Sequence, residues 1–418
     1  MIKRKMLVSM LIAGGLVTPA AYATNGYFAH GYGAKSEGMG GVGIALPQDA
    51  LAAATNPAGM VMVGDRIDFG AELFIPKRSA QITGAGAPGA NGSYDGNDKK
   101  YFLIPNFGYN KMMGPDYSLG VSIYGNGGMN TDYKVNPFAA YGGAGNGGVN
   151  LEQLFIAPTW SKKLNATNSV GVALNLAYER FSAQGIQGFT AASQTPSAVS
   201  NNGTDSATGY GLHVGWIGEV SPTVTLGATY QTKTRMSKLS KYSGLFAEQG
   251  GFDIPATYGV GIAVKAAPTT TVAFDIQRIM YGDVPAIANP IANMTVQGNP
   301  LGSNAGPGFG WGNLTVYKLG IAHQYDSDLT LRAGWTHNNV PYPTSETFFN
   351  ILAPGVVKDN LTFGATWKRA DKSEISMFYM HAFKHTVDGT PNSIPVGYGG
   401  GIASNSLSED SLGISYGW

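Results

Sequence analysis

The feature that most constrains this chain is a series of fourteen segments of about ten residues in which apolar and polar side chains alternate. The connections switch regularly between short polar turns and linkers of about twenty to thirty-five residues that are rich in Gly, Asn and Pro. An even number of strands with short turns at one end and long loops at the other is typical of an outer-membrane β-barrel. The segments are Ile67–Ile75, Tyr101–Tyr109, Tyr117–Tyr124, Leu151–Lys162, Ser169–Phe181, Tyr210–Glu219, Val224–Thr232, Tyr258–Lys265, Thr270–Ile279, Val316–Tyr325, Leu329–His337, Leu361–Lys368, Ile375–His381 and Leu412–Trp418.

The alternation also assigns a face to each residue of these segments. In Leu361–Trp367 the odd-numbered residues are Leu, Phe, Ala and Trp, whereas the even-numbered residues are Thr, Gly and Thr. Because a strand has period two, such a segment has one apolar face and one polar face. The apolar face turns inward in a soluble protein, but it faces lipid around a polar lumen in a membrane barrel.

The aromatic residues favour the membrane barrel over a soluble β-sandwich, because they sort into two belts near the strand ends. Amphipathic rings are expected at the two interfaces between water and lipid. The belt near the long loops is Tyr178, Tyr210, Tyr230, Tyr258, Tyr317, Trp335 and Tyr379. The belt near the short turns is Tyr117, Trp160, Trp216, Tyr325, Trp367, Tyr416 and Trp418. We predict an all-β fold, a fourteen-stranded antiparallel transmembrane barrel over residues 67–418.

The amino terminus has the pattern of a secretory signal peptide at residues 1–23. Three basic residues precede the apolar stretch Met6–Val17, and Ala21-Tyr22-Ala23 fits a cleavage site. The apolar stretch is too short to be a comfortable membrane anchor, and no later segment reaches about eighteen continuous apolar residues. We therefore expect export to the bacterial outer membrane and a mature chain that begins near Thr24.

Composition excludes several classes of function. A net charge of +1 argues against a nucleic-acid partner, and the absence of cysteine excludes disulfides and thiolate metal sites. Charged residues make up 13%, against about 25% in an ordinary soluble domain. The carboxyl terminus, Leu412–Trp418, alternates and ends in an aromatic residue, so it resembles the signal that the barrel-assembly machinery recognises as a partner.

The segment before the first strand, residues 24–66, does not alternate and is rich in small residues. It is too long for a linker, and it has too little apolar bulk to fold alone. Asp49 is a plausible cap for one or two helical turns over Ala50–Ala54. Because the lumen of a fourteen-stranded barrel is wide enough to hold such a piece, we predict an N-terminal hatch that plugs it.

This segment resembles the N-terminal hatch of the FadL/TodX family of outer-membrane transporters for hydrophobic compounds. The resemblance rests on the runs Asn25-Gly26-Tyr27, Gly38-Met39-Gly40-Gly41 and Asn56-Pro57-Ala58-Gly59, together with Asp49. Two loop runs, Tyr242–Gly250 and Phe252–Pro255, also look like that family.

The resemblance implies passive uptake of hydrophobic molecules, with long-chain fatty acids as the first expectation and aromatic hydrocarbons or alkanes as the alternative. It also implies that contacts of Asn56-Pro57-Ala58 hold an inward kink in the strand Tyr117–Tyr124, which leaves an opening in the barrel wall. The hatch and gating residues expected on this basis are Thr24, Asn25, Asn56, Pro57, Ala58 and Gly59.

Apolar residues on a long extracellular loop form either a ligand groove or simple loop packing. The groove candidates are Leu245, Phe246, Phe252 and Ile254. Strand parity directs Asp68, Glu72, Glu179, Asp275, Lys318 and Arg332 into the lumen. Lys318 and Arg332 are candidates to bind the carboxylate of a fatty acid, and the alternative is that these charges pair with each other or hold the hatch.

We predict neither an enzyme nor a bound cofactor or metal. Gly38–Gly43 matches the dinucleotide-binding fingerprint but does not follow a strand in a βαβ unit. His381 and His385 have the spacing of a helical metal pair, but they lie at a strand end, and no serine–histidine–carboxylate order is readable. The expected partners are a hydrophobic small molecule and outer-membrane lipid, and the barrel is expected to be a monomer. A general porin and a surface adhesin or receptor remain the rival functions.

Overall fold

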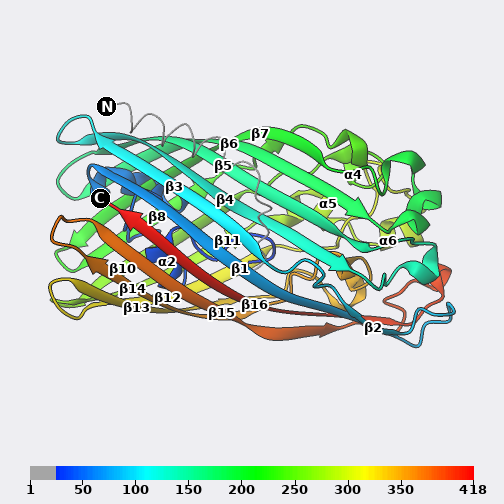
Figure 1. The fold of residues 1–418 in the computed structure, drawn as a ribbon. Coiled ribbons are helices and arrows are strands. Elements are labelled where there is room, and N and C mark those ends of the chain that lie inside the picture. Colours follow the sequence, from blue (N-terminus) through cyan, green and yellow to red (C-terminus); the bar gives the residue numbers. More distant parts are fainter. Residues whose placement is uncertain (1–24) are drawn as a thin grey trace, which may run out of the picture.

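Fourteen antiparallel strands close into a barrel in the computed structural model, which describes residues 25–418 (Figure 1). The barrel strands are β1 Arg66–Thr83, β3 Phe102–Met112, β4 Tyr117–Tyr133, β5 Gly147–Lys163, β6 Asn168–Gln184, β7 Asp205–Ser221, β8 Val224–Gln231, β10 Thr257–Ala267, β11 Thr270–Ile279, β12 Leu314–Gln324, β13 Leu329–Asn338, β14 Asp359–Lys368, β15 Glu374–Asp388 and β16 Ile402–Gly417. Two short strands, β2 Gly92–Asp95 and β9 Arg235–Met236, add to β1 and β7. Pairing of β1 with β16, from Asp68↔Gly417 to Thr83↔Ile402, closes the cylinder.

The predicted fold class is therefore confirmed, and each of the fourteen predicted segments overlaps one barrel strand. Several strands extend further toward the long loops than predicted, notably β1, β4, β15 and β16. These extensions, such as Gly125–Asn130 and Ser404–Glu409, are polar or glycine-rich on both faces. They lack the alternation that marks a lipid-facing strand, which explains why the pattern missed them.

The outer surface has the predicted lipid-facing character. Apolar residues such as Leu174, Leu319 and Phe363 are exposed on the outside of the strands, and thirteen of the fourteen belt aromatics are exposed with them. Trp216 is the exception: it is half-buried, and its Nε1 donates to Asn168 Oδ1 at 3.0 Å. Across residues 25–418, no helix combines the length and the apolar character that a membrane crossing would require.

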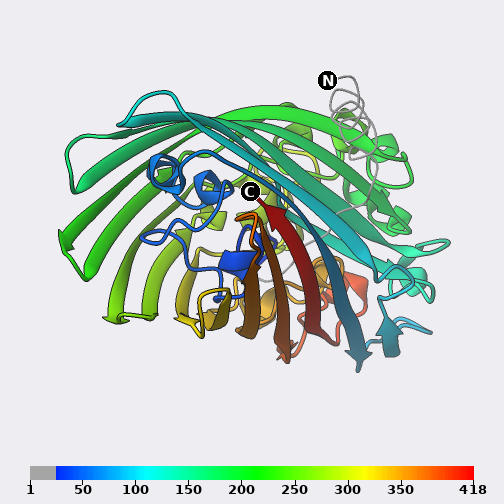
Figure 2. The ribbon, with the colours of Figure 1, turned by 60° about the vertical axis from the view of Figure 1, so that its left-hand side comes forward.

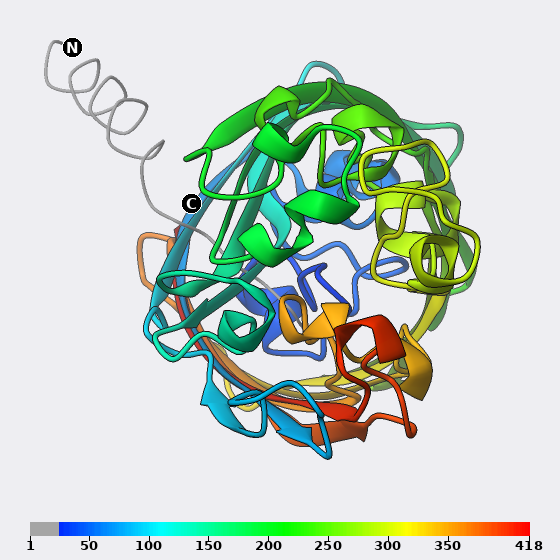
Figure 3. The ribbon, with the colours of Figure 1, turned by 90° about the vertical axis from the view of Figure 1, so that its right-hand side faces the viewer.

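The long loops gather at one end of the barrel and carry short helices (Figures 1 and 3). The α-helices of these loops are α4 Ala247–Gly250, α5 Pro285–Ala288 and α6 Ala292–Thr295. The 3₁₀ helices are η3 Ala139–Tyr141, η4 Gln187–Ala192, η5 Pro196–Ala198, η6 Ser240–Tyr242, η7 Tyr281–Asp283, η8 Thr344–Glu346, η9 Phe349–Ile351 and η10 Val396–Tyr398.

Residues 25–65, which we call the hatch, lie inside the cylinder (Figures 2 and 3). They form four short helices: α2 Ala34–Glu37, η1 Ala52–Ala54, η2 Pro57–Gly59 and α3 Met60–Val63. The Asp49 side chain accepts a hydrogen bond from Leu51 N at 2.9 Å just before η1, and Asn56 caps η2. Thr24 and the predicted signal peptide lie outside the described residues.

Glycines of the wall make room for the hatch backbone. A Cβ on Gly334 would lie 2.1 Å from Gly40 N, and one on Gly227 would lie 2.2 Å from Ile44 O. The same close approach occurs at Gly108, Gly171, Gly215, Gly320 and Gly364. The polar face of the strands is therefore shaped to the hatch, because any larger residue at these positions would push the hatch inward.

Candidate functional site

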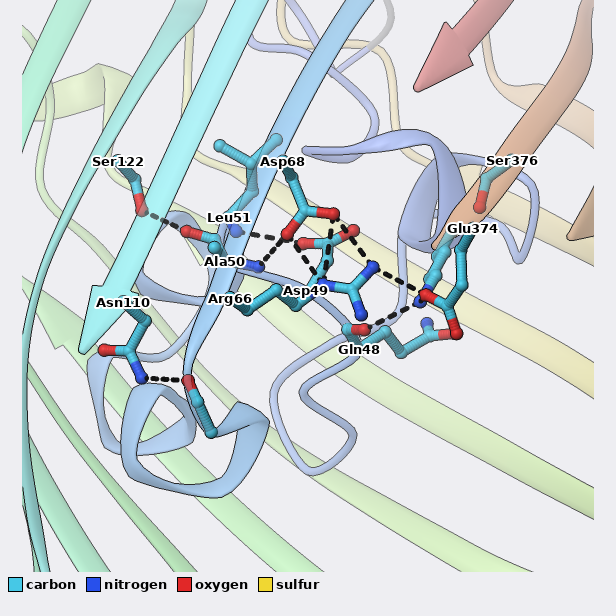
Figure 4. A network of polar contacts seen from close by, with 12 residues as sticks. Gln48, Asp49, Ala50, Leu51, Arg66, Asp68, Asn110, Ser122, Glu374 and Ser376 are labelled. Carbon is cyan, nitrogen blue, oxygen red and sulfur yellow. Dashed lines mark hydrogen bonds and ion pairs between the residues drawn. The ribbon is translucent and has the colours of Figure 1, made fainter. Parts of the chain in front are cut away.

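Polar lumen side chains take the place of water around the hatch backbone. The Asp275 carboxylate accepts hydrogen bonds from Gly43 N at 2.8 Å and Ile44 N at 3.0 Å. Ser122 Oγ donates to Ala50 O at 2.8 Å, and Asn110 Nδ2 donates to Met60 O at 2.7 Å (Figure 4). A hatch with few apolar residues gains stability from such bonds, because buried backbone groups left without partners are costly.

Ion pairs add to this attachment at the level of α2. Glu374 of β15 lies 2.6 Å from both Lys35 of the hatch and Arg66 of β1. Arg66 also pairs with Asp68 at 2.8 Å, and Asp68 accepts from Ala50 N at 2.9 Å (Figure 4). These charges are largely buried, so the network joins the hatch to β1 and β15, the strands on either side of β16.

Burial shifts the pKa values of the ionisable hatch residues. The pKa of Asp49 rises to about 6 because of burial and the neighbouring Asp68, an effect that Lys35 opposes. Burial and the nearby Lys318 ammonium lower the pKa of His30 to about 3. His30 is therefore neutral at physiological pH, and its ring lies 6.0 Å from that of Phe378.

Lys318 and Arg332, the predicted carboxylate ligands, are both used by the hatch. Lys318 Nζ donates to Gly41 O at 3.3 Å, close to Asp275. Arg332 donates to Gln48 Oε1 at 3.1 Å and to Thr366 Oγ1 at 2.7 Å. Both side chains therefore hold parts of the hatch, and neither lines the cavities described below.

Asn56-Pro57-Ala58 lies against the wall formed by β5 to β8. Asn56 Nδ2 donates to Ile44 O at 2.8 Å and to Trp216 O at 3.1 Å, while its Oδ1 accepts from Ala58 N at 3.1 Å. Ser161 and Ser169 donate to Ala58 O at 3.0 and 3.1 Å. None of these hydrogen bonds reaches the bulge in β4, so they do not hold a kink there. A different part of the hatch contacts the bulge, as described below.

The wall is interrupted between β3 and β4. The β3–β4 ladder runs from Met112↔Ser118 to Phe107↔Ile123 and stops there, although β3 continues back to Phe102 beside β1. Strand β4 then bulges between Gly125 and Gly127 while keeping its pairing with β5. The third barrel strand, β4, therefore departs from β3 beyond Ile123, at the end of the segment Tyr117–Tyr124.

The tip of the hatch, residues 25–29, contacts this bulge. Gly128 N donates to Tyr27 O at 2.9 Å, and Ala29 N donates to Asn126 O at 3.2 Å. A Cβ on Gly127 would lie 2.1 Å from Tyr27 O, so glycine is needed for the approach. The tip is itself tied together, because Asn25 Nδ2 donates to Ala29 O at 3.1 Å.

A row of polar side chains continues from the bulge along the wall. Asn126 donates to Gln153 Oε1 at 3.2 Å, and Gln153 donates to Glu179 Oε2 at 2.8 Å. Gly127, Gln153 and Glu179 are direct partners across β4, β5 and β6, so the row lies at the level of the tip. The row fixes the bulge from the side opposite β3.

An apolar pocket lies under the long loops, which we call the outer pocket. Of the four groove candidates, Leu245 and Phe246 line it, whereas Phe252 and Ile254 are buried beside it. The Phe252 ring lies 4.8 Å from Phe246 and 6.2 Å from Tyr27, so a chain of rings connects the pocket to the tip. The pocket has an empty volume of about 470 Å³, part of it open to solvent, and its lining contains no polar side chain: Val149, Phe181, Ile186, Phe189, Leu245, Phe246, Ala286, Leu301, Pro307, Gly308, Phe309, Phe349 and Leu352.

A second cavity, which we call the inner cavity, adjoins the tip. It is lined by Gly26, Tyr27, Arg78, Met129, Asn130, Trp311, Ala353, Pro354, Gly355 and Leu407. Phe309 and Leu352 of the outer pocket are close in sequence to Trp311 and Ala353 here, and the Phe309 and Trp311 rings lie 6.5 Å apart. Sequence analysis missed Arg78, because the predicted first strand ended at Ile75 whereas β1 continues to Thr83.

Comparison with family models decides the family. The model described as outer membrane protein transport protein (OMPP1/FadL/TodX) matches residues 14–402. The chain belongs to this family. It is a bacterial outer-membrane β-barrel, and its family transports hydrophobic compounds. No curated protein matches the sequence.

Solved structures show the same fold at low sequence identity. The toluene transporter TodX of Pseudomonas putida is 18% identical with a TM-score of 0.68, covering 93% of this chain and 98% of that one. A FadL homologue of Pseudomonas aeruginosa is 16% identical with a TM-score of 0.66, covering 94% and 99%. The toluene transporter TbuX of Ralstonia pickettii is 18% identical with a TM-score of 0.63, covering 93% and 98%.

Proposed function

We propose that this protein carries hydrophobic molecules across the outer membrane from the outer pocket to an exit in the barrel wall between β3 and β4. The ligand enters the outer pocket, passes the inner cavity as the hatch tip moves aside, and leaves where the β3–β4 ladder stops. The observation that carries the proposal is that stop at Phe107↔Ile123, with the tip paired to the bulge beside it.

The physical reason for a lateral exit is the difference between the two media that the ligand could enter, the aqueous periplasm or the hydrocarbon of the bilayer. An apolar solute gains nothing by entering the periplasm, because leaving water is what favours its binding. The lumen below the tip is occupied by the hatch and its polar and charged partners. A gap in the wall instead leads from an apolar cavity to the hydrocarbon of the bilayer.

For the substrate we propose long-chain fatty acids, with aromatic hydrocarbons as the alternative that the uncharged lining of the outer pocket favours. The transporters named in the comparisons include both a FadL homologue and toluene transporters. We also propose that the barrel acts as a monomer without a cofactor, and that residues 25–29 and Asn56–Gly59 take part in gating. A porin would need a lumen free of the hatch, and an adhesin has no use for a gap in the wall.

A pair of introduced cysteines tests the exit, since the chain has no cysteine of its own. Continuing the β3–β4 register beyond Phe107↔Ile123 places Pro105 opposite Gly125 across the gap. Bridging a Pro105→Cys/Gly125→Cys variant with a short bifunctional thiol reagent should reduce uptake at least about tenfold, and a reductant should restore it.

The matched control is Tyr109→Cys/Val121→Cys, a pair inside the intact ladder, where the same bridge should leave uptake unchanged. Uptake that survives complete bridging across the gap would refute the lateral exit. Equal losses in both pairs would show that any rigid link between β3 and β4 is harmful, and would also count against it.

A further inference from the structure

Two buried carboxyl groups meet where the hatch helix α2 packs against the wall. Glu37 of α2 and Glu72 of β1 are each 2% exposed, and their side chains are hydrogen-bonded to each other. Ser411 of β16 also donates its hydroxyl to Glu72 Oε1. A carboxylate has no hydrogen to donate, so two carboxyl groups can form this bond only if one of them is protonated. The geometry therefore requires a proton in the pair.

The surroundings of Glu37 favour this proton. Lys35 lies on the same helix but is engaged elsewhere, because it pairs with Glu374 at 2.6 Å. The charged groups that act on the Glu37 carboxyl, those of Glu72 and Asp49, are acidic. Burial and these two neighbours raise the pKa of Glu37 well above its ordinary value of 4.5.

The other ionisable groups near the pair supply no counter-charge. The His30 ring, which is neutral, is hydrogen-bonded to the Glu37 backbone carbonyl. Wall strands β14, β15 and β16 also pack against α2. The ionisable side chains that face this region are Tyr32, His30, Lys35 and Asp49 of the hatch, Arg66 and Asp68 of β1, Glu374 of β15 and Glu409 of β16. The two cations among them are both paired with Glu374.

The two contacts that hold α2 differ in how they respond to pH. The helix has the sequence Ala-Lys-Ser-Glu, so it offers little apolar surface to the wall. On one side Lys35 pairs with Glu374, a contact between opposite charges that needs no added proton. On the other side the contact of Glu37 with Glu72 exists only while the pair holds its proton.

We propose that Glu37 and Glu72 form a latch in which one shared proton holds α2 to β1, and that opening of the hatch at this point releases the proton to water. In the closed hatch the pair carries one negative charge. In the opened hatch both groups are hydrated carboxylates with two negative charges, and the proton has passed to the solvent. The latch concerns how the hatch is held, so it does not depend on which molecule is transported.

The latch makes the closed hatch more stable in acid than in alkali. Between the ordinary pKa of 4.5 and the raised pKa of Glu37, the closed hatch binds one more proton than the opened hatch. The equilibrium constant for opening therefore rises about tenfold for each pH unit in this interval. Above about pH 6 Asp49 adds little to this change, because its own pKa is about 6.

The test is hydrogen–deuterium exchange of the intact protein in an amphipathic polymer at about pH 6, 7 and 8. The reporters are the amides of residues 37–41, among which Gly38 N donates to Ala34 O at 3.0 Å and Gly41 N donates to Ser36 O at 2.8 Å. Their protection in the wild-type protein, corrected for intrinsic exchange rates, should fall at least about tenfold from pH 6 to pH 8. In Glu37→Gln and in Glu72→Gln an amide donates to the remaining carboxylate, so protection should change less than about threefold.

Asp49→Asn is the matched control, since it removes another buried carboxyl group of the hatch. It should keep the wild-type fall between pH 6 and pH 8. Wild-type protection that does not vary with pH would overturn the latch, and so would a fall that persists in a folded Glu37→Gln or Glu72→Gln barrel. Loss of the fall in Asp49→Asn would overturn it as well, because the pair would then not be its source.

The two glutamine variants change the pair from the hatch side and from the wall side. Heat-modifiable mobility in electrophoresis shows which of them has an intact barrel, and either one decides the question alone. Uptake does not enter the readout, so failure of the latch would leave the proposed transport function standing.

Discussion

Replacing Asn56 by Ala tests how the hatch is held in the barrel. The change removes the acceptor for Ala58 N, an N-cap whose loss costs about 0.5–2 kcal/mol. It also removes the donors to Ile44 O and Trp216 O, each worth about 0.5–1.5 kcal/mol net. Together the losses amount to roughly 1.5–5 kcal/mol, which raises the population of an opened hatch at least about tenfold.

The assay has two readouts on the same preparation. Hydrogen–deuterium exchange should show at least about tenfold lower protection of residues 52–60 in Asn56→Ala, while the barrel keeps its heat-modifiable mobility in electrophoresis. Uptake of hydrophobic ligand should fall, because Gly26 and Tyr27 of the inner cavity belong to the same hatch.

Asn56→Asp identifies which half of the carboxamide matters. The carboxylate still accepts from Ala58 N, but it can no longer donate, and it directs negative charge toward the Ile44 and Trp216 carbonyls. The Asp variant should therefore lose at least as much protection as the Ala variant. Wild-type protection and uptake in a folded Asn56→Ala barrel would refute this account of the hatch.

Three further changes test the fit between hatch and wall. Asp275→Ala removes the acceptor of two hatch N–H groups, so it should raise ion conductance in planar bilayers, whereas Asp275→Asn keeps an acceptor and should raise it less. Gly334→Val should assemble as a barrel yet conduct ions steadily, because a Cβ there would lie 2.1 Å from Gly40 N. The pKa of Asp49 in the folded protein is about 6, against an ordinary value of 3.8, so ionisation of its carboxyl group destabilises the hatch. Exchange protection of the hatch, corrected for intrinsic exchange rates, should therefore fall as the pH rises from about 4 to 6. Asp49→Asn should remove this part of the pH dependence.

The barrel could be predicted from sequence because its physics is local to each strand. Lipid on one side and a polar lumen on the other require alternation, and alternation is visible in segments such as Leu361–Lys368 without knowledge of the fold. The prediction was incomplete where a strand rises above the lipid. There both faces of β16 meet water or loops, and residues such as Ser404–Glu409 show no periodic signal.

The positions of lumen charges could be predicted, but their partners could not. Parity correctly directed Asp275 and Lys318 inward, and both are buried. Whether Lys318 meets a ligand or the hatch depends on how a non-periodic segment folds inside the cylinder, and that is a tertiary property. Arg78 illustrates the converse, because the alternating segment ends at Ile75 and gives no face to a residue beyond it, although β1 continues to Thr83.

The polarity of the surroundings of the hatch supports the proposed lateral exit. A plug with so little apolar bulk is stable because carboxylates, amides and hydroxyls of the wall replace water around its backbone, and those same groups make the lower lumen unfavourable for an apolar chain. The hatch and its polar partners therefore exclude an apolar ligand in the inner cavity from the lower lumen. Release through the wall beside the β4 bulge avoids the lower lumen, because an apolar ligand can enter lipid there.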